Sequence, residues 1–127
     1  MNGLGEDTSI YIQIARTLER DILRGILKEG ERVPSSNELA RAYTINPATA
    51  AKGLNLLVDA GILYKKRGLG MFIAEGARAR LAAERQHEFL ERFIQPMVRE
   101  AKMLGISPKE LSQLLADSLT AWEENGR

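Results

Sequence analysis

The sequence has no cysteine and only one histidine among its 127 residues. Without cysteine there is neither a disulfide framework nor a thiolate zinc site, and a single histidine does not favour a histidine-based metal sensor. No apolar run is long enough to cross a bilayer, and the N-terminus lacks the pattern of a signal peptide. We therefore expect a cytoplasmic protein that has no membrane partner.

A strong charge of one sign is also missing. Lys and Arg together number 18 and Asp and Glu 17, which gives a formal net charge of +1. Many DNA-binding domains are more basic than this, so the local placement of charge has to carry any argument for nucleic acid.

No catalytic constellation is present in the sequence. His87 has no nucleophile or orienting acid at a recognisable spacing, and Gly68-Leu69-Gly70 is too short for a dinucleotide fingerprint. We expect no enzyme activity, no cofactor and no metal site.

What the sequence does contain is two helix starts that lie close together. Ser35 and Glu38 match a capping box, and a short helix follows them. Asn46 caps a second helix, and Pro47 stands at the first helical position, where its missing N–H is harmless. Because only a few residues separate the two helices, they must cross sharply, and the pattern predicts a helix-turn-helix.

The second of these helices has two different faces at helical periodicity. The inward face is aliphatic, and the outward face is small, polar or basic, with Thr49 on its flank. The inward residues are Ala50, Leu54, Leu57 and Val58, and the outward residues are Ala48, Lys52, Asn55 and Asp59. Small side chains at the tip would let this helix approach the major groove closely.

A β-hairpin is predicted after Gly61, which ends the helix as a left-handed cap. Its strands would cover residues 62–66 and 71–74, and Arg32-Val33 would add a short strand. The tip carries Lys65, Lys66 and Arg67 beside Gly68, which allows close backbone approach. Such a wing suits contact with phosphates, or an arginine in the minor groove.

Residues 1–76 are therefore expected to form a winged helix-turn-helix domain, with residues 1–7 as a frayed leader. Its first helix would be capped by Thr8 or Ser9 and stopped by Gly25. The expected core consists of Ile14, Leu18, Ile22, Leu39, Ala40, Leu54, Leu57, Leu63 and Phe72.

Residues 77–127 are expected to form a second domain of two helices. Pro96 should kink the first helix near residues 92–95, Gly105 should end it, and Ser107 with Glu110 forms another capping box. The arginines of the first helix, Arg78 and Arg80 included, are interpreted as solvated and ion-paired.

About fifty residues lie near the lower limit for an independent core, and these two helices cannot bury their apolar surface within one chain. We predict pairing with a second copy about a two-fold axis. The expected interface residues are Phe89, Phe93, Met97, Leu111, Leu115, Leu119 and Trp122.

Residues 11–74 resemble the N-terminal domain of the GntR family of bacterial transcription regulators, and the short C-terminal part resembles the family's YtrA-like branch. The matching positions are Tyr11 to Ala15, Ile22, Gly25 to Leu27, Gly30, Val33 to Ser35, Glu38 to Ala40, Thr49, Leu57, Gly61 to Leu63 and Gly68 to Gly70. The resemblance implies DNA binding, with C-terminal helices that serve mainly for dimerisation. One departure is Asn37, which stands where the family usually has a DNA-contacting arginine.

The sequence thus predicts a mainly α protein with a small β-hairpin that binds double-stranded DNA as a homodimer. The function would be that of a transcriptional regulator, and a repressor in particular, reading a pseudo-palindromic operator. The predicted DNA-binding residues are Ser35, Asn37, Asn46, Ala48, Thr49, Lys52, Asn55, Lys66, Arg67 and Gly68. Two alternatives stay open, a winged-helix protein-interaction module and a sequence-tolerant architectural DNA binder. Whether a small-molecule effector exists also stays open.

Overall fold

The computed structural model describes residues 9–126, so the predicted leader and Thr8 lie outside the described residues. The chain forms two compact units, of which the first ends at Glu84 and the second begins at Arg85. The fold is mainly helical, with one two-stranded antiparallel sheet, as the sequence predicts. The functional division at residue 76 stays a prediction.

The first described helix is α2 (Ile10–Leu23). Ser9 occupies its N-cap position, but the Ser9 side chain makes no capping hydrogen bond, so the predicted cap is present in position only. The helix ends as expected at Gly25, whose φ is +79° and whose N–H donates to the Ile22 carbonyl at 3.1 Å. Its buried residues are Ile14, Ala15, Leu18 and Ile22.

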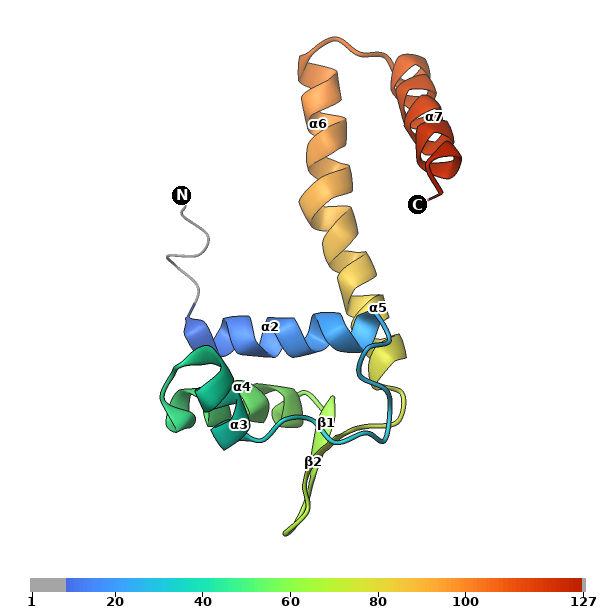
Figure 1. Ribbon diagram of the computed structural model, residues 1–127. Helices are drawn as coiled ribbons and strands as arrows, with labels where there is room; N and C mark the ends of the chain where they lie inside the picture. Colours follow the sequence, from blue (N-terminus) through green and yellow to red (C-terminus); the bar gives the residue numbers. More distant parts are fainter. Residues whose placement is uncertain (1–8, 127) are drawn as a thin grey trace. The chain divides into compact units, whose positions relative to one another are not determined.

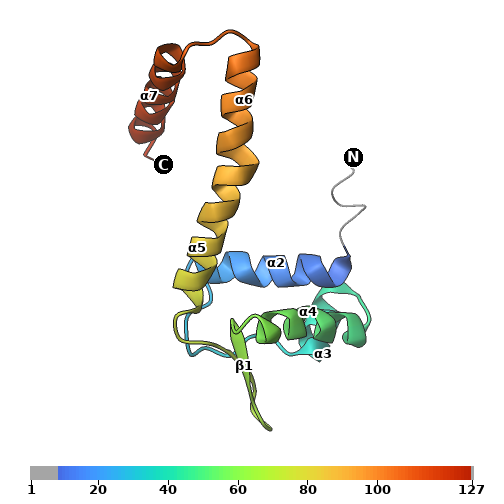
Figure 2. The ribbon, with the colours of Figure 1, turned by 180° about the vertical axis from the view of Figure 1, so that it is seen from behind.

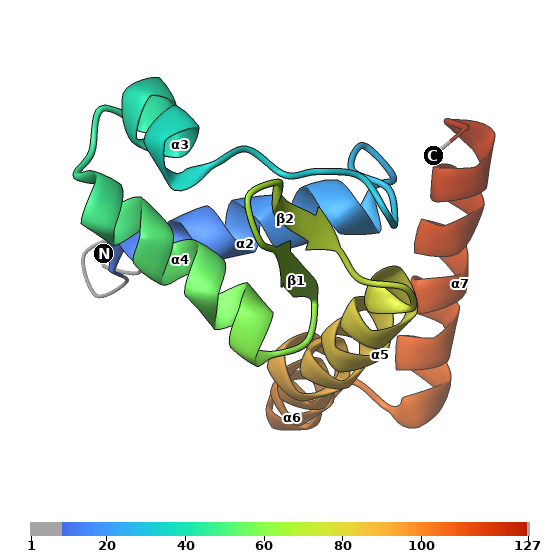
Figure 3. The same ribbon diagram turned by 90° about the horizontal axis from the view of Figure 1, so that it is seen from below.

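Two helices form the predicted helix-turn-helix, α3 (Ser36–Tyr43) and α4 (Pro47–Asp59). Both predicted caps are confirmed, with Ser35 in a full capping box and Asn46 accepting from the Ala48 N–H at 2.8 Å. The turn between the helices passes through Thr44, which has a left-handed backbone with φ of 56°. Figure 3 shows α4 lying across α2 in this unit.

The crossing of α2 and α4 depends on Gly53, a buried residue inside α4. A Cβ atom at this position would lie 2.7 Å from the Tyr11 carbonyl oxygen and 3.3 Å from the Ile14 side chain. Glycine normally weakens a helix interior by about 1 kcal/mol. Here it is needed because the two helix backbones approach too closely for any side chain.

The hairpin consists of β1 (Leu63–Lys66) and β2 (Gly70–Ile73), and it projects away from α2 (Figures 1 and 2). Arg32 forms the expected short third strand as an isolated bridge to Phe72. One core prediction is wrong, because Ile73 is fully buried while Phe72 is only half-buried. Leu63 pairs with Ile73, and successive strand residues face opposite sides, so Phe72 shares the other face with Tyr64.

The start of α5 (Ala77–Phe89) belongs to the first unit and buries Ala77 and Leu81. Two arginines on its first turns bond to backbone carbonyls at the ends of other helices. Arg78 Nε donates to the Leu23 carbonyl at 3.0 Å, and the Arg80 guanidinium donates to the Gly61 carbonyl. Both arginines are exposed, as expected, but these bonds go to backbone carbonyls and not to the expected carboxylates. Sequence spacing gives no sign of a partner 19 or 55 residues away.

The second unit contains the π-helical segment η1 (Leu90–Ile94), α6 (Gln95–Met103) and α7 (Pro108–Glu124). The expected disturbance near Pro96 takes the form of this π turn, because proline cannot donate to the preceding helical turn. Gly105 has a φ of 78° and ends α6, and Ser107 with Glu110 forms the predicted capping box. The chain then reverses direction into α7 (Figure 1).

Very little of the second unit is buried. Among residues 85–126, Ala101 is the one buried side chain, and α7 buries none of its residues. Nothing described within the chain covers the apolar faces of these helices. No helix between residues 9 and 126 has both the length and the apolar character needed to span a bilayer.

Candidate nucleic-acid interface

The exposed end of α4 carries most of the predicted groove contacts. Ala48, Lys52 and Asn55 are exposed, and Thr49 is half-buried beside them. Asn46 is exposed at the N-cap, where its Oδ1 accepts the Ala48 N–H. The N–H groups of Thr49 and Ala50 also bond to Asn46, through its carbonyl at 2.9 and 3.1 Å. This helix end therefore offers small and polar side chains and the positive end of the helix dipole, which is an arrangement suited to phosphate.

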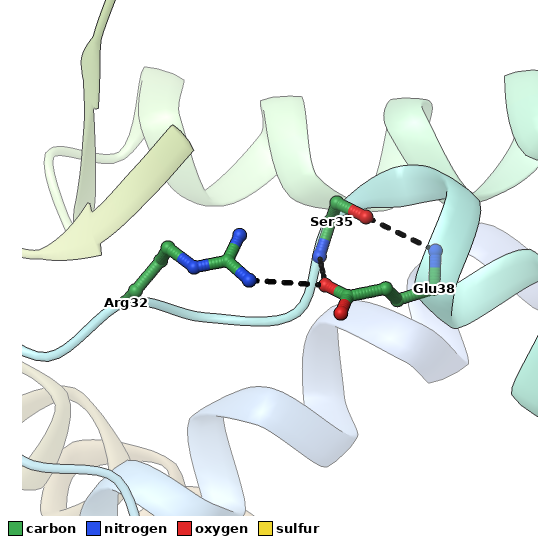
Figure 4. Close-up of polar contacts among 3 residues, drawn as sticks. All are labelled: Arg32, Ser35 and Glu38. Atoms are coloured by element: carbon green, nitrogen blue, oxygen red, sulfur yellow. Dashed lines mark hydrogen bonds and ion pairs between the residues drawn. The ribbon is translucent and has the colours of Figure 1, made fainter. Parts of the chain in front are cut away.

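The N-terminus of α3 is fixed by the Ser35–Glu38 capping box (Figure 4). The Glu38 N–H donates to Ser35 Oγ at 3.1 Å, and the Ser35 N–H donates to Glu38 Oε1 at 2.7 Å. These bonds to Ser35, and more weakly Arg32 and Arg41, lower the pKa of Glu38 below its ordinary value. Asn37, which lies between Ser35 and Glu38 in the sequence, is exposed.

The wing tip is a tight turn with its basic residues exposed. The Leu69 N–H donates to the Lys66 carbonyl at 2.9 Å, and Gly68 takes a φ of +78°. A positive φ at the third turn position defines a type II turn, which favours glycine. Lys66, Arg67 and Gly68 are all exposed there, and no atom would lie within 4 Å of a Cβ at Gly68.

Arg32 connects the wing to the start of α3. Its backbone pairs with Phe72 in β2, and its side chain lies against Gly70, where a Cβ would come within 3.2 Å of Arg32 Cδ. The guanidinium then reaches Glu38 Oε1 at 3.5 Å (Figure 4). Both side chains are about half exposed, so this ion pair is weak and leaves Arg32 accessible to solvent.

Two of the predicted contact lysines rest on aromatic rings. Lys52 Nζ lies 4.3 Å from the centroid of the Tyr11 ring. Lys66 Nζ lies 4.8 Å from the centroid of Phe72 and 5.9 Å from that of Tyr64. Both lysines belong to the first unit, one on the helix-turn-helix and one on the wing.

The predicted interface residues of the second unit are largely uncovered. Phe89 and Phe93 are each 55% exposed, with ring centroids 5.7 Å apart, and Trp122 is 57% exposed. Leu115 and Leu119 are each 46% exposed, while Met97 and Leu111 are half-buried. These side chains form large apolar surfaces of the kind that interaction sites display.

No metal site accompanies these surfaces in the described part of the chain. Residues 9–126 contain no group of three or more His, Asp or Glu side chains placed to hold an ion.

Sequence reasoning missed the roles of three residues in this domain. The sequence places Tyr11 among the positions that match the family and Arg32 in a short strand, and it indicates no role for Gly53. Their contacts join segments far apart in the chain, and helical periodicity carries no signal for such pairing. The single local signal was a glycine in the middle of an otherwise strong helix.

A capped helix-turn-helix followed by a basic hairpin defines a winged-helix domain. The model of the bacterial regulatory proteins of the gntR family matches residues 10–73. The HTH-type transcriptional repressor YtrA of Bacillus subtilis is 30% identical over 87% of this chain and 84% of its own length. The protein therefore belongs to the GntR family of transcriptional regulators, which are not enzymes.

Solved structures agree with this assignment. A transcriptional regulator of the GntR family from Bacteroides thetaiotaomicron is 32% identical, with a TM-score of 0.73 over 90% of this chain and 99% of that chain. The structure of AraR(DBD) in complex with operator ORX1 is 28% identical, with a TM-score of 0.51 over 58% of this chain and 90% of that chain.

Proposed function

We propose that this protein is a transcriptional repressor that binds a pseudo-palindromic operator as a homodimer. The observation that carries the proposal is the joint exposure of two elements of one compact unit, the tip of α4 and the basic tip of the wing. Both lie on the same side of α2 (Figures 1 and 2). An exposed helix end and a basic hairpin match the two grooves of one DNA segment.

The groove contacts are assigned to the exposed face of α4. Thr49 and Lys52, together with Asn55, would face the major groove, and Ala48 would allow the helix to approach the bases closely. Ser35, Asn37 and Asn46, at the two helix starts, would lie near phosphates.

The wing contacts are assigned to the turn residues. Arg67 would enter the minor groove or bind a phosphate, with Lys66 beside it. Gly68 would allow the turn backbone to lie directly against the DNA, because its position is open and has no side chain.

Dimerisation through the second unit is supported by its uncovered apolar side chains, with Phe93, Leu115 and Trp122 among them. An isologous dimer would bury these faces against their own copies. It would also set two α4 helices roughly 34–36 Å apart, which is one turn of DNA, so the operator should have two related half-sites.

Repression is supported by the relatives. YtrA of Bacillus subtilis is named a transcriptional repressor, and the structure of AraR(DBD) holds an operator. A dimer bound over a promoter would exclude polymerase by occupancy alone. Such a protein would act in the cytoplasm, where the DNA is.

Fluorescence anisotropy with DNA from upstream of the protein's own gene tests the proposal. Tight binding of this duplex and weak binding of a scrambled one, over a salt series, is the expected result. Lys52→Met should weaken binding and reduce the salt slope by about 1.8, the value for two phosphate contacts, because each subunit of the dimer loses one. The matched control is Lys109→Met on α7, which should leave both values unchanged.

Three outcomes would contradict the proposal. Equal affinity for both duplexes would support an architectural DNA binder. Absence of binding to either duplex at low salt would support a protein-interaction module. Equal effects of the Lys52 and Lys109 variants would remove α4 from the interface.

A further inference from the structure

Two lysines of the proposed DNA surface, one on α4 and one on the wing, lie over aromatic rings. Lys52 Nζ lies 4.3 Å from the centroid of the Tyr11 ring, and Lys66 Nζ lies 4.8 Å from the centroid of the Phe72 ring. A cation within about 6 Å of a ring centroid is attracted by the negative face of the ring. The two pairs lie on different elements and do not share a residue.

The Tyr11–Lys52 pair is set by the backbone and not by chance contact of two surface side chains. Gly53 brings α4 so close to α2 that a Cβ there would collide with the Tyr11 carbonyl. Lys52 precedes Gly53 in α4 and is itself exposed, and its ammonium lies over the Tyr11 ring of α2. The closest approach of the two helices therefore places the Tyr11 ring beside the Lys52 side chain.

The flank of a helix in the major groove faces the phosphate walls of the groove, while its crest faces the base edges. The contact with the Tyr11 ring holds the Lys52 ammonium at such a flank of α4. Lysine is a flexible point charge, and immobilising a long side chain on binding costs affinity. A ring that already restricts the side chain in the free protein removes part of that cost.

We propose that Tyr11 is a positioning residue for DNA binding, which holds the Lys52 ammonium where a DNA phosphate will lie. Phe72 does the same for Lys66 on the wing. This inference rests on the proposed function, since it needs DNA to lie against α4 and the wing.

The wing pair explains a feature that core packing does not. Phe72 is half-buried although it is large and apolar, and it stacks on Tyr64 with ring centroids 6.0 Å apart. Both rings lie on the face of the hairpin opposite the buried Leu63 and Ile73. On that face they form a platform under Lys66.

The test is a double-mutant cycle of Tyr11→Leu and Lys52→Met, read by anisotropy with the upstream duplex over a salt series. Tyr11→Leu should lower affinity by roughly 2- to 10-fold for each half-site, the range for ordering one long side chain, and should leave the salt slope unchanged because the charge remains. Lys52→Met should reduce the slope by about 1.8, because both subunits of the dimer lose one phosphate contact.

Two further variants separate positioning from a general structural role. Tyr11→Phe keeps the ring, so its affinity for the duplex should stay within about 2-fold of that of the wild type. The double variant Tyr11→Leu/Lys52→Met should bind no more weakly than Lys52→Met alone, because the ring then has no ammonium to hold.

The results that overturn the inference are distinct from those that overturn DNA binding. Additive losses in the cycle would make Tyr11 merely structural, and a rise in affinity for Tyr11→Leu would mean that the ring holds Lys52 away from DNA. If Lys52→Met has no effect while the wild type still prefers its native duplex, this inference and the assignment of Lys52 to the DNA contacts are both wrong, but sequence-specific DNA binding is retained. If Tyr11→Leu does not fold, the cycle of Phe72→Leu with Lys66→Met decides by the same criteria.

Discussion

Thr44 is the most strained residue of the helix-turn-helix. It is the one non-glycine residue with a positive φ between residues 9 and 126, and it is β-branched, which makes that conformation costly. Thr44→Gly should therefore raise the free energy of unfolding by about 1 kcal/mol, measured by urea denaturation. Thr44→Ala keeps the Cβ and should gain much less, and a loss of stability with glycine would contradict this explanation.

Glu38 makes the stability of α3 sensitive to pH. Hydrogen bonds from Ser35 lower the pKa of Glu38 in the folded protein below its ordinary value of 4.5. Its contribution to stability is therefore complete above pH 4.5 and is lost as the pH falls below that value.

Glu38→Gln should make the unfolding free energy less dependent on pH in this acid range than it is in the wild type. Glutamine still fits a capping box, so the variant should keep the native fold at pH 7. Chemical denaturation at pH 6 and below pH 4.5 measures the difference between the two proteins. Equal pH dependence in both would show that Glu38 does not stabilise the folded state through its charge.

Among the helices, α5 is attached to the first unit by its two leading arginines. Arg80 donates to the Gly61 carbonyl just beyond α4, and Arg78 donates to the Leu23 carbonyl at the end of α2. Cations near helix C-termini are also favoured by the helix dipole. Arg80→Met should destabilise the protein by about 1 kcal/mol in urea denaturation.

The matched control is Arg85→Met on the same helix. Arg85 contacts Glu88 at 3.7 Å on the surface, and such an exposed pair contributes at most a few tenths of a kcal/mol, so this variant should be close to wild type. Similar losses for both variants would show that the carbonyl bond of Arg80 has no special role.

The boundaries of these elements were predictable because they depend on local chemistry. Ser35, Asn46 and Ser107 all cap the helices that sequence reasoning assigned to them, and Gly61 and Gly105 end theirs. Contacts between distant segments were not predictable. Whether Phe72 or Ile73 faces the core depends on a one-residue strand register, and a hairpin of four-residue strands gives too few alternations to fix it.

For the chain as a whole, binding to two half-sites requires that the second unit holds two copies of the protein together. Leu115→Asp should place a charge in the apolar interface and give a monomer in sedimentation velocity at micromolar concentration. Operator affinity should then fall by about 100-fold or more, because the two half-sites are no longer bound together. Ile26→Asp, an exposed apolar residue of the first unit, is the control and should remain dimeric. A variant Leu115→Asp that stays dimeric would exclude this face as the interface.

Hydroxyl-radical footprinting of the upstream DNA tests the central proposal most directly. A dimer with two α4 helices should protect two related segments whose centres are separated by about one helical turn, roughly 10 base pairs, with further protection where the wings lie. Protection of a single segment would contradict the symmetric dimer. Uniform weak protection along the whole duplex would contradict operator recognition itself.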